Sequence, residues 1–302
     1  MQSIPFIGFS DPISSWSHLL AAPVAFLGGY FLFKRGRGNK VRLFALGLYT
    51  FSLIFLFSMS GVYHLLDRGG AARSVLQRLD YAGIWILIAG TFTPIHTILF
   101  RKAWRWLVLL FIWTVAITGL VLQVIFFKDF PELLTLALFL GLGWVGLLTM
   151  RKFHLSYSHE SALFLAFGGI FYSIGALLEY AQWPVVWTGV FGPHEVFHLF
   201  VIVAAYCHWK FIYYWSRYPV GDQMTFDVQV FGDDNYVASS RGEALVLKSH
   251  NLETLKDEIV HMVSDHYWPN QAHSIRLKYF HEENLSPKNA VSRALEKNLN
   301  LF

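Results

Sequence analysis

The stretch LFALGLYTFSLIFLFSMSGVYHLL, residues 43–66, contains no Asp, Glu, Lys or Arg and is rich in Leu and Phe. Its length is sufficient for a helix that crosses about 30 Å of hydrocarbon, which takes about 20 residues. Near its end it carries an imidazole, His64, with a hydroxyl, Ser60, one helical turn earlier. The stretch therefore predicts a membrane-spanning helix whose last turn holds unexpected polar groups.

The composition of the whole chain is that of a membrane protein. Its 302 residues are 55% hydrophobic and only 15% charged, whereas soluble proteins carry about 25% charged residues. No short apolar region with a small-residue cleavage site is recognisable, so the first apolar segment is expected to be retained. Seven apolar segments predict an all-α bundle of seven transmembrane helices, at 16–33, 43–66, 81–100, 104–127, 132–150, 161–181 and 195–215.

The pattern changes after about residue 222 to that of a small soluble domain. Alternation of polar and apolar residues predicts strands, and helical spacing with N-capping residues predicts helices. We therefore expect two domains, a seven-transmembrane domain at 1–221 and an appended small α+β domain at 222–302. Within the second domain, strands are expected at 225–231, 243–249 and 274–280, and helices at 251–268 and 286–298.

Basic residues are unevenly distributed between the two faces of the expected bundle. Seven spans put the chain termini on opposite sides of the membrane. Lys and Arg crowd the loops on the side of the C-terminal domain, and the positive-inside rule assigns such a side to the cytoplasm. The sequence therefore predicts a multi-pass protein with an external N-terminus and a cytoplasmic C-terminal domain. The N-terminal side carries fewer basic residues, namely Arg68, Arg73, Arg78 and Lys128.

Ionisable side chains inside the spans gather on the N-terminal side. A charged group at mid-membrane costs about 2.5–3.5 kcal/mol on insertion scales, so such residues are functional candidates. His64 ends the second span and Asp80 opens the third. The seventh opens with His194 and His198, whose i, i+4 spacing places both imidazoles on one helical face. Topology alone thus brings these groups to one membrane depth.

Three imidazoles on one face of a bundle suit a zinc ion, because three protein ligands and an open position are typical of catalytic zinc. We therefore predict zinc as cofactor, with His64, His194 and His198 as ligands. Ser60 and Asp80 would orient a ligand ring or a water made acidic by zinc, and Asp80 could instead act as general base.

Each feature also has a simpler explanation when taken singly. A lone H-x-x-x-H pair is a weak signal, and Ser60 could hydrogen-bond its own helix. Asp80 could be a helix N-terminal charge stabilised by the helix dipole. His18, His96, His159 and His208 are interpreted as interfacial or packed side chains, and Cys207 as a buried free thiol.

Taken together, these motifs resemble the hemolysin III / progestin and adipoQ receptor (PAQR) family, within the wider alkaline ceramidase-like seven-span superfamily. The resemblance covers about residues 10–217, and the C-terminal domain lies outside it. It implies zinc ligands at His64, His194 and His198, the family serine and aspartate at Ser60 and Asp80, and a lipid-accessible cavity. The matching motifs are SSWSHLL (14–20), SGVYH (60–64), LDYAGIWILIAGTFTP (79–94) and PVVWTGVFGPHEVFHLF (184–200).

The resemblance leaves three functions open. The first is a zinc-dependent hydrolase of a lipid amide or ester, since the receptor and ceramidase branches imply hydrolysis of a ceramide-like amide. The second is a membrane receptor or lipid-homeostasis sensor with a structural zinc. The third, a cytolytic pore, is disfavoured because the charges cluster at one face. The expected partners are the bilayer and a membrane lipid, with a protein bound by the C-terminal domain as a further candidate, and no nucleic acid is expected.

Overall fold

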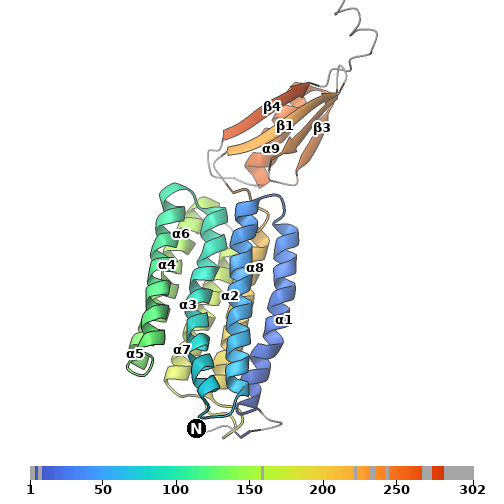
Figure 1. Cartoon of the computed structure of the whole chain (residues 1–302). Helices are drawn as coiled ribbons and strands as arrows, with labels where there is room; N and C mark the ends of the chain where they lie inside the picture. Colours follow the sequence, from blue (N-terminus) through green and yellow to red (C-terminus); the bar gives the residue numbers. More distant parts are fainter. Residues whose placement is uncertain are drawn as a thin grey trace, which may run out of the picture. The chain divides into compact units, whose positions relative to one another are not determined.

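The computed structural model describes residues 4–5, 9–157, 160–220, 223–231, 235–241, 245–266 and 274–281. Within these residues the chain divides into two compact units, with the boundary between Asp222 and Gln223. The first unit is a bundle of helices and the second a small sheet with one helix (Figure 1). The predicted fold class, seven transmembrane helices with an appended small α+β domain, is confirmed.

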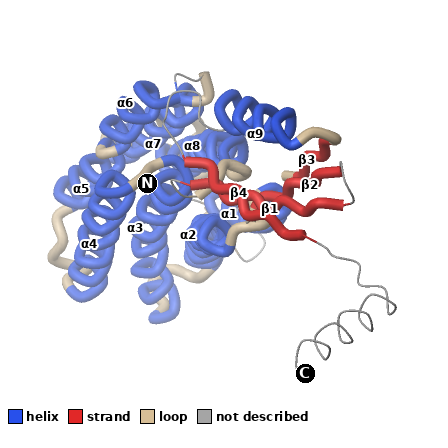
Figure 2. The backbone as a smooth tube through the Cα atoms, turned by 90° about the horizontal axis from the view of Figure 1, so that it is seen from above, coloured by secondary structure: helices blue, strands red, loops and turns tan. Residues whose placement is uncertain are grey.

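The bundle contains seven helical segments long and apolar enough to cross a membrane. Two consecutive helices, α5 and α6, together form the fifth of these segments, Glu132–Leu155. Seen from above, the helices lie side by side (Figure 2), with α2 packed between α1 and α3 and α7 packed against α8. The elements are α1 (Pro12–Arg35), α2 (Lys40–Leu65), α3 (Ala71–Leu99), α4 (Lys102–Ile125), α5 (Glu132–Trp144), α6 (Gly146–Tyr157), α7 (Ala162–Tyr180) and α8 (Pro193–Trp215).

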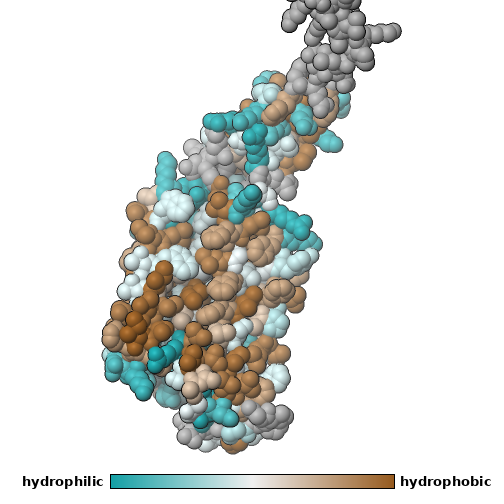
Figure 3. Space-filling view, viewed as in Figure 1, coloured by the Kyte–Doolittle hydropathy of each residue, from teal (hydrophilic) through white to brown (hydrophobic). Residues whose placement is uncertain are grey.

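The flank of the bundle is hydrophobic and its ends are polar (Figure 3). Large apolar side chains such as Phe26, Phe44 and Leu110 are more than 60% exposed on that flank. Such exposure is unfavourable in water, but a bilayer surrounds these side chains with hydrocarbon. The surface pattern therefore agrees with a bundle that spans a membrane.

Two helix boundaries differ from the predictions. α3 begins at Ala71 and not near residue 81, because the segment AARSVLQRL, expected as a loop, continues the helix without a Gly or Pro. Asp80 consequently lies inside α3, and the dipole at a helix N-terminus does not explain its position. The fifth span also runs past its expected end at residue 150, through α6 to Tyr157.

Close packing of the first three helices depends on small residues. A Cβ added to Gly83 of α3 would lie 2.9 Å from the Leu56 side chain of α2, and one at Gly90 would lie 2.4 Å from the Ser52 hydroxyl. Small residues let helix backbones approach each other where the hydrophobic effect does not drive association. α2 and α3 are thereby held close enough for side chains of both to face one site.

A buried arginine ties chain segments together at the end of α2 opposite His64. Arg42 is 1% exposed, and its guanidinium donates to the carbonyl oxygens of Gly36 at 2.9 Å, Arg37 at 2.7 Å and Tyr218 at 2.7 Å. The first two lie between α1 and α2, and Tyr218 follows α8. Arg42 therefore joins the α1–α2 connection to the segment that follows α8.

The second unit is a four-stranded sheet in the order β3-β2-β1-β4, with β4 parallel to β1 and the other pairs antiparallel. The apolar stripe of α9 packs Leu255, Ile259 and Val263 against Phe226 and Val228 of the sheet. The sequence did not predict β2, whose residues NYVASS are mostly small and polar, and the helix expected at 286–298 lies outside the described residues. The elements are β1 (Gln223–Phe231), β2 (Asn235–Ser240), β3 (Val246–Ser249), α9 (Leu252–His266) and β4 (Ser274–His281).

The role of Arg42 predicts a specific loss of stability. Arg42→Met keeps a side chain of similar length but leaves buried carbonyl oxygens without donors, which should destabilise the bundle by roughly 2–4 kcal/mol. Thermal unfolding of the protein in detergent should show a lower Tm. Arg37→Met, a change of an exposed side chain in the same connection, is the control, and equal Tm values for the two variants would contradict this role.

Candidate metal centre

The structure brings together the three histidines that the sequence singles out. His64 lies in the last turn of α2, and His194 and His198 lie in the first turns of α8. The Nε2 atoms of His64 and His194 are 2.9 Å apart. One potential ligand atom from each of the three residues lies within 4.8 Å of the other two. This spacing allows all three to bind one metal ion.

The start of α8 is fixed by a glutamate at its N-terminus. Glu195 Oε2 accepts a hydrogen bond from the Gly192 N–H at 2.9 Å, and Oε1 accepts one from the Ser14 hydroxyl of α1 at 2.7 Å. Pro193 occupies the first turn, where a missing N–H costs nothing. These contacts hold the turn that carries His194 against α1.

The Nδ1 atom of each histidine has an acceptor close by. His64 Nδ1 is 3.2 Å from a carboxylate oxygen of Asp11, and His194 Nδ1 is 3.1 Å from Glu179 Oε1. His198 Nδ1 is 3.1 Å from the Ser14 carbonyl oxygen. Carboxylates and carbonyls accept hydrogen bonds, so a neutral ring carries its proton on Nδ1 and leaves a lone pair on Nε2.

This tautomer makes the cluster suitable for a metal. If each of the two rings carries its proton on Nδ1, the Nε2 lone pairs of His64 and His194 face each other across 2.9 Å and repel. A cation between them removes the repulsion, and neutral imidazole nitrogens are preferred ligands of zinc. Acceptors on Nδ1 that orient the ring are the usual surroundings of metal-binding histidines. The donor set therefore fits zinc.

Sequence reasoning missed the two carboxylates that hold the histidines. Asp11, at the N-cap of α1, accepts hydrogen bonds from Arg68 at 2.5 Å and from Arg73, in addition to its contact with His64. Glu179 is the one acidic residue of α7. An acidic residue at the very end of an otherwise apolar span was the available signal for Glu179. Nothing in the local pattern linked Asp11 to a histidine 53 positions away.

Ser60 and Asp80, the other predicted site residues, lie next to each other on facing helices. Ser60 is buried on α2, and its side chain lies near the Asp80 carboxyl of α3. Asp80 lines the same cavity as His64 and His194. The predicted pair is therefore close to the histidines, with Asp80 facing the cavity and Ser60 beside Asp80.

The cavity in front of the histidines is polar and measures about 490 Å³. Carboxylates predominate among its charged lining groups, and Arg73 adds a positive charge. A surplus of negative charge near neutral imidazoles favours a bound cation. The carboxylates are those of Asp11, Asp80, Glu179 and Glu195.

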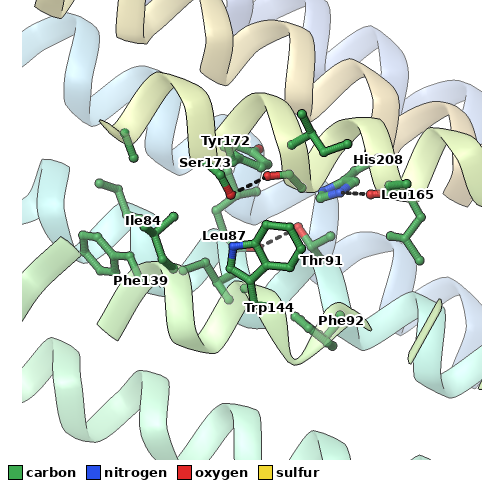
Figure 4. Close-up of a pocket in the computed structure, with 18 of the residues that line it drawn as sticks. Ile84, Leu87, Thr91, Phe92, Phe139, Trp144, Leu165, Tyr172, Ser173 and His208 are labelled. Atoms are coloured by element: carbon green, nitrogen blue, oxygen red, sulfur yellow. Dashed lines mark hydrogen bonds between the residues drawn. The ribbon is translucent and has the colours of Figure 1, made fainter. Parts of the chain in front are cut away.

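A second cavity, about 270 Å³ in volume, is lined mainly by apolar side chains of α2, α3, α5, α6, α7 and α8 (Figure 4). Four helices, α2, α3, α7 and α8, contribute to both cavities, and on the last three the lining changes from polar to apolar within one turn. These steps are from Tyr81 to Ile84 on α3, from Glu179 to Ala176 on α7, and from His194 to Phe197 on α8. A polar site thus adjoins an apolar one on the same helices.

The remaining intramembrane histidines differ in their surroundings. His96 is packed as expected, with Nδ1 3.0 Å from the Trp104 carbonyl oxygen and Nε2 3.0 Å from the Thr149 hydroxyl. His18 is also packed, but its ring stacks on that of His198, with centroids 3.7 Å apart. His159 lies outside the described residues. Cys207 is a buried free thiol, as predicted.

Comparisons with known proteins agree with this architecture. A family model described as Haemolysin-III related matches residues 8–209. Hemolysin-3 of Bacillus cereus is 29% identical over 169 residues, which are 56% of this chain and 73% of that protein. The Hemolysin-3 homolog of Bacillus subtilis is 25% identical over 171 residues, 57% of this chain and 76% of that protein. The Adiponectin receptor protein of Drosophila melanogaster is 28% identical over 225 residues, 68% of this chain and 50% of that protein.

The acceptors on Nδ1 predict graded losses of zinc affinity. Asp11→Asn and Glu179→Gln should each weaken zinc binding about 10- to 100-fold, because an amide orients the imidazole less well than a carboxylate. His198→Ala should remove stoichiometric zinc. Competition with a chromophoric chelator in detergent measures the affinities. His154→Ala, which removes an exposed imidazole of α6, is the control, and unchanged affinity in Asp11→Asn and Glu179→Gln would contradict the assigned roles.

Proposed function

The chain belongs to the haemolysin-III related family, and from this premise we propose that it is a zinc-dependent hydrolase of a membrane lipid amide or ester. The observation that carries the proposal is the step from a polar, histidine-bearing cavity to an apolar cavity on the same three helices. A lipid has the matching division, with a polar linkage at one end of a hydrocarbon chain. Such a lipid can place its carbonyl at the histidines and its chain in the apolar cavity.

Each polar residue of the centre has a distinct task in this proposal. His64, His194 and His198 would hold zinc, which polarises a carbonyl and makes water a nucleophile near neutral pH. Asp11 and Glu179 keep the Nε2 lone pairs of their histidines directed inward. Ser60, which lies near Asp80, would orient the carboxyl that faces the cavity.

Asp80 would act as general base in the reaction. It accepts a proton from water as the water oxygen bonds to the acyl carbon. The C–N or C–O bond then breaks, and Asp80 returns the proton to the leaving nitrogen or oxygen. The products are a fatty acid and an amine or alcohol, and atoms and charges balance without any other reactant.

A receptor or lipid sensor with a structural zinc is the second candidate. Two observations favour it: a relative named Adiponectin receptor protein, and a separate C-terminal unit beyond the residues that the family model matches. Under this reading zinc would stabilise the bundle without lipid turnover. Removal of zinc would then lower the Tm strongly, while the zinc-loaded protein would hydrolyse no ceramide or acyl ester.

For the orientation, we propose that the histidines face the external or lumenal side. Four basic residues, Lys34, Arg35, Arg37 and Lys40, lie at the α1–α2 connection, at the opposite end of α2 from His64. The positive-inside rule places such a connection in the cytoplasm. A green fluorescent protein fused after Phe302 should therefore resist protease added outside intact cells, and digestion of this fusion before lysis would overturn the orientation.

The role of Asp80 predicts loss of turnover without loss of metal. Asp80→Asn should reduce fatty-acid release from ceramide or an acyl ester about 10²- to 10⁴-fold, the usual contribution of a general base, while zinc content stays near that of the unmodified protein. Liquid chromatography of released fatty acid and metal analysis provide the two readouts.

Two controls make this experiment decisive. Asp129→Asn changes an exposed carboxylate on the same side of the bundle and should leave turnover unchanged, and His198→Ala should lose both zinc and turnover. The proposed function fails if the zinc-loaded protein releases no fatty acid from any ceramide or ester. The role of Asp80 alone fails if Asp80→Asn is as active as the control.

A further inference from the structure

A second imidazole site lies on α8, ten residues beyond His198. His208 is buried and lines the apolar cavity. Its Nε2 is 3.3 Å from the Leu165 carbonyl oxygen of α7 (Figure 4). Its Nδ1 is buried and has no hydrogen-bond partner within the described part of the chain. Because a carbonyl only accepts, the proton of the neutral ring lies on Nε2. Nδ1 is therefore an unused acceptor.

The His208 ring is seated by a glycine. A Cβ added to Gly168 would lie 2.1 Å from His208 Cδ2, so α7 leaves out a side chain at the point where the imidazole packs. The contact with Leu165 comes from the preceding turn of the same helix. The ring is thus held in one orientation by both steric fit and a hydrogen bond.

A second unpartnered group lines the same cavity one turn further along α7. The Tyr172 hydroxyl is buried and has no hydrogen-bond partner among the residues that the structure describes. Its ring centroid is 5.5 Å from that of His208, at an interplanar angle of 51°. Buried polar atoms without partners are uncommon, and each calls for an explanation such as a ligand or a water.

Two hydroxyls of the cavity wall are already satisfied. The Thr91 hydroxyl donates to the Leu87 carbonyl oxygen at 2.7 Å. The Ser173 hydroxyl donates to the Gly169 carbonyl oxygen at 2.8 Å. These two hydroxyls are bonded within their own helices, as is common in membrane spans. His208 Nδ1 and the Tyr172 hydroxyl differ from these two hydroxyls and can each bind a polar group of a ligand.

We propose that this cavity binds an acyl chain that carries a hydroxyl group, which donates to His208 Nδ1 and accepts from the Tyr172 hydroxyl. A hydroxyl supplies one donor and acceptor lone pairs, so it satisfies both atoms. An acyl chain without a hydroxyl group would leave both atoms unpaired, and sites with buried polar groups reject such ligands. The remaining wall, which includes Ile84, Leu87 and Phe139, suits hydrocarbon.

The position of the hydroxyl along the chain follows from helix geometry. Ten residues at a rise of 1.5 Å place His208 about 15 Å from His198 along α8. The recognised hydroxyl is therefore distant from the reacting carbonyl and lies well along the acyl chain. This position of the hydroxyl rests on the proposed function, because it assumes that the acyl chain belongs to the lipid whose carbonyl lies at the histidines.

Binding without turnover tests the proposal. The probes are hydroxystearate isomers with the hydroxyl at successive carbons, and stearate, each competing with a fluorescent fatty acid for the zinc-loaded protein in detergent. One group of isomers should bind about tenfold more tightly than stearate, as expected from one or two net hydrogen bonds. Tyr172→Phe and His208→Phe should abolish this preference while stearate binds as before.

Ser173→Ala is the matched control, since it removes a hydroxyl that is already bonded within α7, and it should keep the preference. Zinc content and elution as a single species show that each variant is folded. Equal affinity of all isomers and stearate for the unmodified protein would overturn the proposal. A structural water would then be the partner of His208 Nδ1 and the Tyr172 hydroxyl. A preference that persists in Tyr172→Phe and His208→Phe would also overturn it.

The outcomes separate this proposal from the proposed function. Preferential binding of a hydroxylated chain together with absence of lipid hydrolysis would refute the hydrolase and retain the hydroxyl site. Hydrolysis of ceramides or esters without any preference for hydroxylated acyl chains would support the hydrolase and refute the hydroxyl site.

Discussion

A polar side chain inside a membrane span must find its partner within the protein, because hydrocarbon offers none. The bundle meets this requirement with contacts between distant segments, such as Ser14 with Glu195 and Trp85 with Gln123. The same requirement explains why the histidines of the metal centre each have an acceptor on Nδ1. Partners that satisfy the rings also direct them, so the demands of the membrane and of metal binding lead to the same geometry.

Asp11 shows how closely the centre is coupled to the fold. Its carboxylate is shared between His64 and two arginines, Arg68 and Arg73, from the connection and first turn that follow α2. One residue at the start of α1 thereby fixes both a candidate ligand and the entry into α3. Asp80 is carried on that same helix, so the position of the proposed base depends on contacts made a full span away in sequence.

Hydropathy and helical spacing were enough to predict the seven spans and the residues that meet at the centre. The spans follow from length and composition, and the i, i+4 spacing of His194 and His198 with the topology of seven helices places them beside His64. Asp11 and Glu179 could not be predicted in the same way, because their roles depend on which helix ends pack together. The early start of α3 was missed because its first turns are polar, and β2 because Asn, Ala and Ser make up most of its residues.

The two polar points on α8 differ in kind. At His64, His194 and His198, nitrogen lone pairs lie close together and favour a bound cation. At His208, the free acceptor Nδ1 and the nearby Tyr172 hydroxyl suit a hydroxyl group. Both points include side chains of α8, His194 and His198 at one and His208 at the other, so the backbone of this helix sets their separation and side-chain flexibility cannot alter it much. A lipid that satisfies both must match that separation along its chain. Selection would then rest on where the chain carries its oxygen, a distinction that an apolar cavity alone cannot make.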